Sequence, residues 1–188
     1  PLGHITRITR NSVGQPEIVT LPDESQIRME YDVRGNVSCI TDMLGNHIFY
    51  EYDAINRITG VTDGRGNVTN YIYDAKSRLI KLVNAVGNVR EFIYNEDGKM
   101  TEAIDYDGCR IKIAYGENGK KKSFQDKEGN VTLYDYDLNG NLKEVKMPNG
   151  GIRKYEYDSR NQLIAYVNEM GEVSEYEYDK NGNRIKLI

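Results

Sequence analysis

A tyrosine recurs every 21 residues along this chain, eight times in succession and without a slip. We call these eight positions the anchor column: Tyr31, Tyr52, Tyr73, Tyr94, Tyr115, Tyr136, Tyr157 and Tyr178. A fixed period of this kind is typical of repeat proteins, in which each unit packs only against its neighbours. The sequence therefore predicts a tandem array in which these tyrosines are structural repeat anchors.

Turn-forming residues follow the same period at two places in each repeat. Seven positions before the anchor stand Gly45, Gly66, Gly87, Gly108, Gly129, Gly150 and Gly171, and only Glu24 breaks this turn column. Four positions after the anchor stand Gly35, Asn56, Ser77, Gly98, Gly119, Gly140, Asn161 and Gly182. Gly and Asn adopt positive φ most readily, and Asp or Asn is common where a hairpin turn begins. We therefore expect two turns per repeat.

The segments between the turns have the pattern of β-strands. Residues around each anchor alternate between apolar and polar, as in Tyr50-Glu51-Tyr52, which indicates a strand with one dry and one wet face. A second apolar segment follows, with apolar residues six and nine positions after the anchor, such as Ile58 and Val61. Their spacing of three departs from alternation and predicts a β-bulge or an inward-packing turn residue. Each repeat then holds two strands of about six to eight residues.

The predicted fold class is all-β, with antiparallel hairpin repeats of 21 residues forming a curved or spiralling open β-sheet strip, a shell segment. About 16 strands result from eight repeats, and sheets beyond about 10 strands usually curl because strand twist accumulates. A parallel β-solenoid with 21-residue rungs is the alternative. It needs three strand segments per rung, whereas the pattern has two strands and two turns.

The pattern also divides the chain. We expect residues 1–4 to be the remnant of an expression tag, residues 5–30 to be a degenerate edge repeat, and residues 31–188 to be one continuous array. In the edge repeat Arg10 takes the place of an anchor, and Gly14 matches the turn glycine. We expect the segment to be cut from a longer array. Sheet edges exposed at residues 10–30 and at Ile185–Ile188 would then favour homo-association.

Composition excludes several classes of function. The net charge is −4, so we predict no nucleic-acid binding, and no apolar run approaches the roughly 18 residues of a membrane-spanning helix, so we predict no membrane insertion. Hydrophobic residues make up 38% of the chain, with fifteen Tyr and no Trp. This composition is typical of turns and half-buried strands rather than of an enzyme with a deep apolar core.

The side chains that could carry chemistry do not converge in the sequence. We interpret His47 as a surface residue at a strand end, and His4 as part of the tag junction. Cys39 and Cys109 occupy different repeat positions, about three repeats apart, so we expect no disulfide between them. We therefore predict no catalytic residue.

Two other motifs have a structural interpretation. The turn at residues 137–141 superficially resembles a calcium loop but lacks the EF-hand ligand spacing, so we interpret it as a plain turn. Lys120-Lys121-Lys122 is a short basic run that we interpret as a solvated turn rather than a polyanion site. We accordingly predict no cofactor and no metal.

Tyr52-Asp53-Ala54-Ile55-Asn56-Arg57-Ile58 and Tyr73-Asp74-Ala75-Lys76-Ser77-Arg78-Leu79 resemble the YD repeat of rearrangement-hotspot (Rhs) proteins, and the resemblance covers about residues 10–188. Related arrays occur in bacterial wall-associated proteins, insecticidal toxin complexes and animal teneurins. The resemblance implies a spiralling β-sheet shell that encloses a C-terminal toxin or presents a surface, in a secreted or cell-surface protein. The remaining repeats and the toxin or cargo would be its partners.

The family's paired-Asp self-cleaving protease and its Asp-Pro-x-Gly-Leu signature have no counterpart in this chain. The leading prediction is therefore a non-catalytic shell segment. The alternative is a module that binds cell-surface carbohydrate or cell wall through Tyr faces such as those of Tyr50 and Tyr155, because aromatic rings can stack on sugars or cations. The absence of Trp weighs against this alternative, since repeats of that type resemble Trp-rich cages.

Overall fold

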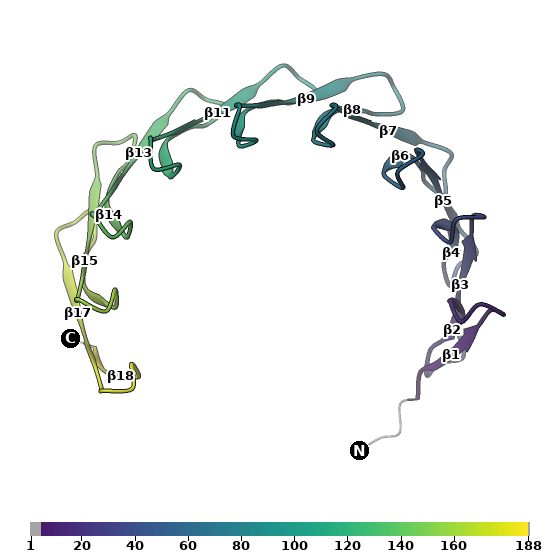
Figure 1. Cartoon of the computed structure of the whole chain (residues 1–188), viewed down its shortest axis with the longest axis horizontal. Helices are drawn as coiled ribbons and strands as arrows, with labels where there is room; N and C mark the ends of the chain where they lie inside the picture. Colours follow the sequence, from purple (N-terminus) through teal and green to yellow (C-terminus); the bar gives the residue numbers. More distant parts are fainter. Residues whose placement is uncertain (1–4, 188) are drawn as a thin grey trace. The chain divides into compact units, whose positions relative to one another are not determined.

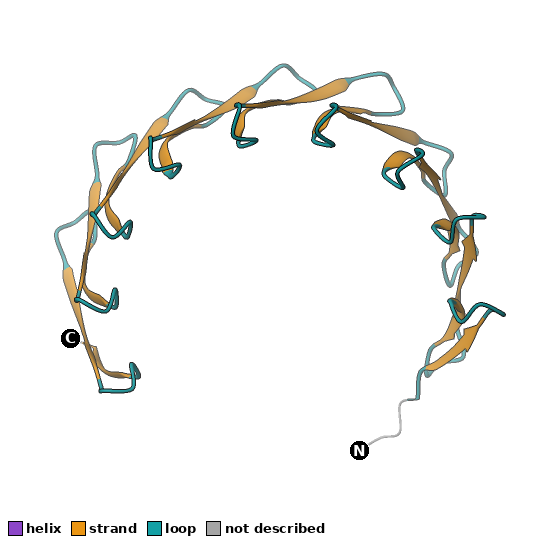
Figure 2. Ribbon diagram, viewed as in Figure 1, coloured by secondary structure: helices purple, strands orange, loops and turns teal. Residues whose placement is uncertain are grey.

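The computed structural model describes residues 5–187, and these residues form strands and turns only (Figures 1 and 2). The strands are β1 (Arg7–Arg10), β2 (Pro16–Thr20), β3 (Gln26–Tyr31), β4 (Val37–Thr41), β5 (His47–Tyr52), β6 (Ile58–Thr62), β7 (Val68–Tyr73), β8 (Leu79–Val83), β9 (Val89–Tyr94), β10 (Met100–Ile104), β11 (Arg110–Tyr115), β12 (Lys121–Gln125), β13 (Val131–Tyr136), β14 (Leu142–Lys146), β15 (Ile152–Tyr157), β16 (Leu163–Val167), β17 (Val173–Tyr178) and β18 (Arg184–Leu187). The prediction for residues 1–4 lies outside the described residues, as does Ile188.

Each strand pairs antiparallel with its neighbour in the sequence, so the order of strands in the sheet follows the chain. This confirms the predicted antiparallel hairpin repeat and excludes the parallel β-solenoid. The chain divides into two compact units, one ending at Glu91 and the other beginning at Phe92, and the division falls within β9. Each unit taken by itself is a strip that bends along its length (Figure 1).

The architecture explains the 21-residue period. In the repeat that starts at His47, a six-residue strand, a five-residue turn, a five-residue strand and a second five-residue turn fill one period. The second strand is thus shorter than the predicted six to eight residues, because both turns take five residues rather than the two of a minimal hairpin. We call the turn after each anchor the anchor turn and the other one the return turn, and number their residues 1 to 5.

Both kinds of turn share one backbone frame. In the anchor turn 53–57, the Asp53 N–H donates to the Arg57 carbonyl (3.0 Å), and the Asn56 N–H donates to the Asp53 carbonyl (3.2 Å). The fourth residue has positive φ in every turn, for example 83° at Gly66 in a return turn. Four of these fourth residues are not glycine: Glu24, Asn56, Ser77 and Asn161, with φ between 60° and 66°.

The predicted bulge is present beside the anchor turns. Glu51 pairs with Gly60 and Tyr52 with Ile58, so Thr59 on β6 has no partner on β5. In a regular strand, residues three positions apart point to opposite faces. The extra residue shifts the alternation by one position, so Ile58 and Val61 lie on the same face of the sheet. The spacing of three between apolar residues in this strand is therefore the sequence signature of the bulge.

The two faces of the strip differ in exposure, although neither is a closed core. In the six-residue strand β5 the residues alternate between exposed and half-buried, and Tyr50 and Tyr52 are on the half-buried side. Among residues 5–187 only Cys39 (3% exposed), Val145 (7%) and Gly60 are buried. The face predicted to be dry is thus only half dry, because no second layer covers it within the part of the chain that the structure describes.

Candidate functional site

The half-buried face, which we call the tyrosine face, carries the anchor column and the column two residues before it. Tyr50 lies opposite Val61 in the register, and Tyr155 opposite Tyr166. The column two residues before the anchor thus pairs across the hairpin with the column nine residues after it. The Tyr155 and Tyr166 rings pack in a tilted arrangement with centroids 5.2 Å apart. Rings of this column therefore pack against apolar side chains of the same repeat.

Anchor hydroxyls connect one repeat to the previous one. The Tyr52 hydroxyl donates to the Val37 carbonyl (2.8 Å), fifteen residues earlier in the chain. The same bond runs from Tyr31 to the Pro16 carbonyl (2.5 Å), from Tyr115 to that of Met100 (2.9 Å) and from Tyr178 to that of Leu163 (2.9 Å). Burial of the ring raises the pKa of Tyr52, with smaller contributions from Tyr50 and Asp32. The neutral, proton-donating form is thus favoured where the bond is made.

Where the first residue of a turn is an aspartate such as Asp53 or Asp63, its side chain closes the turn. In the anchor turn after Tyr52, Asp53 Oδ1 accepts the N–H groups of Ile55 (2.9 Å) and Arg57 (3.0 Å), and Oδ2 accepts Arg57 Nε (2.6 Å). The backbone hydrogen bond from Arg57 is the main cause that lowers the pKa of Asp53. In the return turn, Asp63 receives the equivalent bonds from Arg65, Asn67 and the Asn67 side chain.

Charge-stabilising bonds of this kind recur along the chain. The pKa is lowered at the first residue of eight turns: Asp32, Asp42, Asp53, Asp63, Asp74, Asp126, Asp137 and Asp179. A carboxylate that accepts two or three such bonds is held in its ionised form. In these eight turns the carboxylate of the first residue is therefore engaged in hydrogen bonds of its own turn.

A row of hydrogen bonds, which the sequence did not suggest to us, joins successive anchor turns. We call it the turn ladder: the side chain of the fifth residue donates to the fourth residue of the next anchor turn. Asn36 Nδ2 donates to Asn56 Oδ1 (2.9 Å), and Arg57 Nη1 donates to Ser77 Oγ (3.0 Å). Where the next fourth residue is glycine, its carbonyl accepts instead, as at Gly35 from Gln15 Nε2 (3.0 Å).

Of the residues that could carry other chemistry, Cys39 and His47 lie together, with Cys39 Sγ 3.8 Å from His47 Nδ1. His47 is exposed at the start of β5, where its ring stacks on Phe49 with centroids 5.8 Å apart and its Nδ1 is 3.0 Å from Thr41 Oγ1. Cys39 and Cys109 are both free thiols. Within residues 5–187 no three His, Cys, Asp or Glu side chains are placed to hold a metal ion, and no helix is long and apolar enough to cross a membrane.

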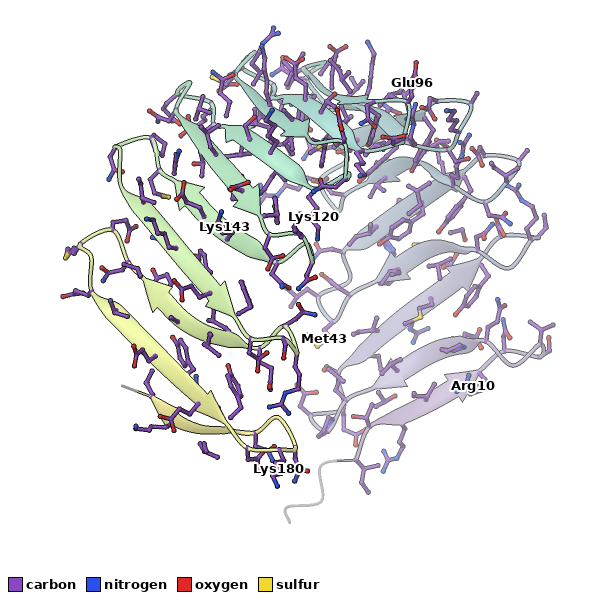
Figure 3. All side chains as sticks on the ribbon, turned by 60° about the vertical axis from the view of Figure 1, so that its left-hand side comes forward. Arg10, Met43, Glu96, Lys120, Lys143 and Lys180 are labelled. Atoms are coloured by element: carbon purple, nitrogen blue, oxygen red, sulfur yellow. The ribbon has the colours of Figure 1, made fainter. Side chains whose placement is uncertain are left out.

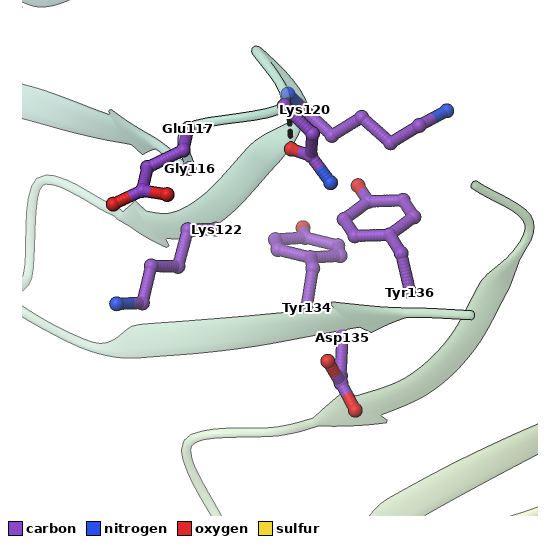
Figure 4. A pocket seen from close by; sticks show the side chains of 8 residues that line it. Gly116, Glu117, Lys120, Lys122, Tyr134, Asp135 and Tyr136 are labelled. Carbon is purple, nitrogen blue, oxygen red and sulfur yellow. Dashed lines mark hydrogen bonds between the residues drawn. The ribbon is translucent and has the colours of Figure 1, made fainter. Parts of the chain in front are cut away.

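The basic run predicted to be a solvated turn lies against aromatic rings of the tyrosine face. The Lys120 Nζ atom is 5.4 Å from the centroid of the Tyr136 ring, and the Lys121 Nζ atom is 4.4 Å from that of Tyr134. A depression of about 670 Å³ lies there, lined by Gly116, Glu117, Asn118, Lys120, Lys122, Tyr134, Asp135 and Tyr136 (Figure 4).

A single-layer antiparallel sheet of equivalent hairpins, linked from repeat to repeat by tyrosine hydroxyls and a turn ladder, defines a structural repeat protein of the shell-forming class. The chain belongs to the Teneurin YD-shell family, whose family model matches residues 47–187. This family confirms the resemblance to Rhs and other YD-repeat proteins. No curated protein matches the sequence closely enough to count as a relative.

Solved toxin-complex structures have a similar fold. The structure of TcdB2-TccC3 superposes with a TM-score of 0.72 and 15% identity over 98% of this chain and 13% of that chain. The Photorhabdus luminescens Tc holotoxin pore with a mutated TccC3 gives a TM-score of 0.65 and 14% identity, with the same coverage. TcdB2-TccC3-Cdc42 gives 0.63 and 13%, covering 97% of this chain and 13% of that one. This chain thus spans about an eighth of the length of the proteins whose fold it shares.

Proposed function

We propose that this chain is a non-catalytic wall segment of a larger β-sheet shell that encloses or presents a toxin or other cargo in a secreted or cell-surface protein. The observation that carries the proposal is the pairing register: successive hairpins join by the same strand pairing. At such a joint a carbonyl of the earlier hairpin accepts the anchor hydroxyl, and a turn side chain of the earlier hairpin donates to the next anchor turn. An array built in this way extends a wall by whole repeats. The remaining repeats and the cargo of the full-length protein are the proposed partners.

Membership of the Teneurin YD-shell family and the fold shared with TcdB2-TccC3 support this proposal. The side chains at the repeated positions support it as well, because they are engaged in packing, in turn closure or in links between repeats. The eight anchors and the seven return-turn glycines are proposed as the structural residues of the wall.

Protease protection in the full-length protein tests enclosure. A protease site is inserted in the region that follows the repeats, and the intact protein is digested under native conditions. The proposal predicts that the site resists cleavage in the native protein and is cut within minutes after denaturation in urea. Equal cleavage of native and denatured protein would contradict enclosure and leave only a presenting wall.

Self-association through strand edges is a separate proposal that the shell function does not require. Unpaired edge strands invite pairing with a second copy. Sedimentation of the 188-residue chain at increasing concentration tests it, and a monomer at every concentration contradicts it.

A further inference from the structure

The cations of the anchor turns are balanced in one unit and unbalanced in the other. In the first unit, the fifth residues Arg57 and Arg78 lie 2.6 Å and 2.7 Å from the carboxylates of the first residues, Asp53 and Asp74. In the second unit the fifth residues Lys99 and Lys120 follow Asn95 and Gly116, neither of which carries a charge. These two lysines therefore lack the ion pair with the first turn residue that Arg57 and Arg78 form, although the same turns carry the acids Glu96, Asp97 and Glu117 at other positions.

A third cation joins them on the tyrosine face. Lys121 takes a position that is apolar in the other complete repeats, from Val37 to Leu163, and its ammonium group lies over Tyr134. Lys99 lies over Tyr115, with Nζ 5.3 Å from the ring centroid. Within the described part of the chain, none of Lys99, Lys120 and Lys121 forms an ion pair. Three lysines without an ion pair thus lie near aromatic rings of two successive repeats, on a chain whose net charge is −4.

The turn at Gly116 keeps the backbone frame that elsewhere surrounds a carboxylate. The Gly116 N–H donates to the Lys120 carbonyl (2.9 Å), and the Gly119 N–H donates to the Gly116 carbonyl (2.8 Å), as in the other anchor turns. There the carboxylate of Asp53 or Asp74 accepts the N–H groups of the third and fifth residues. At Gly116 the fifth residue's N–H instead donates to the Asn118 side chain (3.0 Å).

The depression of about 670 Å³ opens beside this turn and is within the range of about 300–1,000 Å³ of ligand sites. Figure 4 shows the Tyr134 and Tyr136 rings pointing toward the Lys120 turn, while Asp135 points to the other side of the strand. Glu117, the other acid of the lining, is exposed at the turn. The side of the depression that holds the rings thus combines lysine ammonium groups with aromatic surface.

We propose that this depression binds an acidic segment of a polypeptide chain, with a Glu or Asp carboxylate received by Lys120 and by the turn that begins at Gly116. Other anchor turns, such as those at Asp53 and Asp74, place a side-chain carboxylate in the same frame, so the chemistry that fits the turn is that of an acidic side chain. Lys99 and Lys121 add long-range attraction, and the tyrosine rings contact the aliphatic part of the bound segment. This inference does not depend on the proposed shell function.

Fluorescence anisotropy with a dye-labelled peptide of alternating Glu and Gly tests the proposal, at low ionic strength because salt screens exposed charges. The same peptide with Gln in place of Glu is the neutral probe. We expect saturable binding of the Glu peptide and none of the Gln peptide. Gly116→Asp supplies the turn with its own carboxylate and should weaken binding by about tenfold or more.

The double variant Lys99→Gln/Lys120→Gln should weaken binding to a similar degree. Glutamine is chosen because Gln15 and Gln162 occupy the same turn position and still donate to the next turn, so the turn ladder is kept while the charge is removed. Lys143→Gln is the matched control. Lys143 is an exposed lysine on β14, one repeat after Lys122 and outside the depression (Figure 3).

Three results would overturn the proposal. The first is the absence of saturable binding of the Glu peptide. The second is an equal loss in Lys143→Gln, which would reduce the effect to overall charge. The third is displacement of the peptide by a sulfated oligosaccharide that binds more tightly, which would assign the depression to another class of ligand. If Gly116→Asp does not fold by circular dichroism, the lysine double variant decides.

Discussion

At the scale of single residues, the tyrosine and the aspartate of each Tyr-Asp pair have different structural roles. The hydroxyl of Tyr52 reaches back to the previous repeat, whereas the carboxylate of Asp53 closes the turn that follows. The fourth turn residue combines an unfavourable conformation with a favourable contact. Asn56 and Ser77 accept positive φ, which costs a non-glycine residue about 1 kcal/mol or more, and both accept a turn-ladder bond through their side chains.

Gly66→Ala should lower the free energy of unfolding by about 1–2 kcal/mol, because alanine is strained at a φ of 83°. An added Cβ would meet no atom within 4 Å, so the effect is conformational and not steric. Chemical denaturation followed by circular dichroism measures it. Arg65→Ala in the same turn is the control and should change stability by less than about 0.5 kcal/mol. Equal stability of Gly66→Ala and wild type would show that this turn can adopt another frame.

Of the turn features, the positive-φ glycines were predictable from the sequence and the turn ladder was not. The turn glycines could be placed because positive φ leaves a direct mark on residue choice. The turn ladder could not, because its partners, such as Asn36 and Asn56, are 20 residues apart, one short of the period. Their contact depends on the register of the intervening strands. A usable signal was present in two places: Asn36 is followed by Asn56, and Asn141 by Asn161, at the two positions that the ladder joins.

At the scale of the hairpin, the anchor hydroxyl satisfies a carbonyl that the strand ladder leaves out. Val37 precedes Cys39, Ile40 and Thr41, the three residues of β4 that pair with β5. Its carbonyl lies beyond the end of that ladder, and the Tyr52 hydroxyl supplies the donor. The bulge and the anchor hydroxyl therefore act together where successive hairpins join.

Tyr52→Phe should destabilise the chain by about 1 kcal/mol, since it removes this bond and leaves the Val37 carbonyl without its donor. Urea unfolding of the two proteins measures the difference. Tyr50→Phe is the matched control, because the Tyr50 hydroxyl makes no hydrogen bond to a described residue. If both substitutions cost the same, the anchor acts through its ring alone.

The strands themselves were predictable in type and pairing, and less so in length and burial. The alternation around Tyr52 fixed the strand and its inner side, and the spacing between Ile58 and Val61 indicated the bulge. Burial could not be inferred from this alternation, because the same pattern suits a sheet covered by a second layer and one that is bare. Only the low apolar content hinted that the tyrosine face stays half exposed.

At the scale of the whole molecule, the turn carboxylates couple stability to pH. Eight turn aspartates have a lowered pKa in the folded chain, from Asp32 to Asp179. Since an unfolded Asp titrates near about 3.9, their contribution is complete above that pH and is lost as pH falls through the lower folded values. The melting temperature should therefore be nearly constant from about pH 7 to 5 and fall steeply below about pH 4.

Thermal unfolding followed by circular dichroism across this pH range checks the expectation. The triple variant Asp42→Asn/Asp63→Asn/Asp126→Asn removes three of the groups and should melt earlier at neutral pH, with a shallower loss in acid. A wild-type melting temperature that does not change between about pH 7 and pH 3 would contradict the role assigned to the turn aspartates.

Every tie between repeats, whether strand pairing, the Tyr52 hydroxyl bond or the Asn36–Asn56 bond, reaches one copy along and no further. Removing or duplicating a stretch of 21 residues would bring equivalent partners together at the new joint. Inserting or deleting a single residue within a strand would instead turn the inner side chains beyond it in that strand outward, since strand faces alternate residue by residue. Evolution can thus alter the number of copies in such a gene in whole units, without having to invent a new junction.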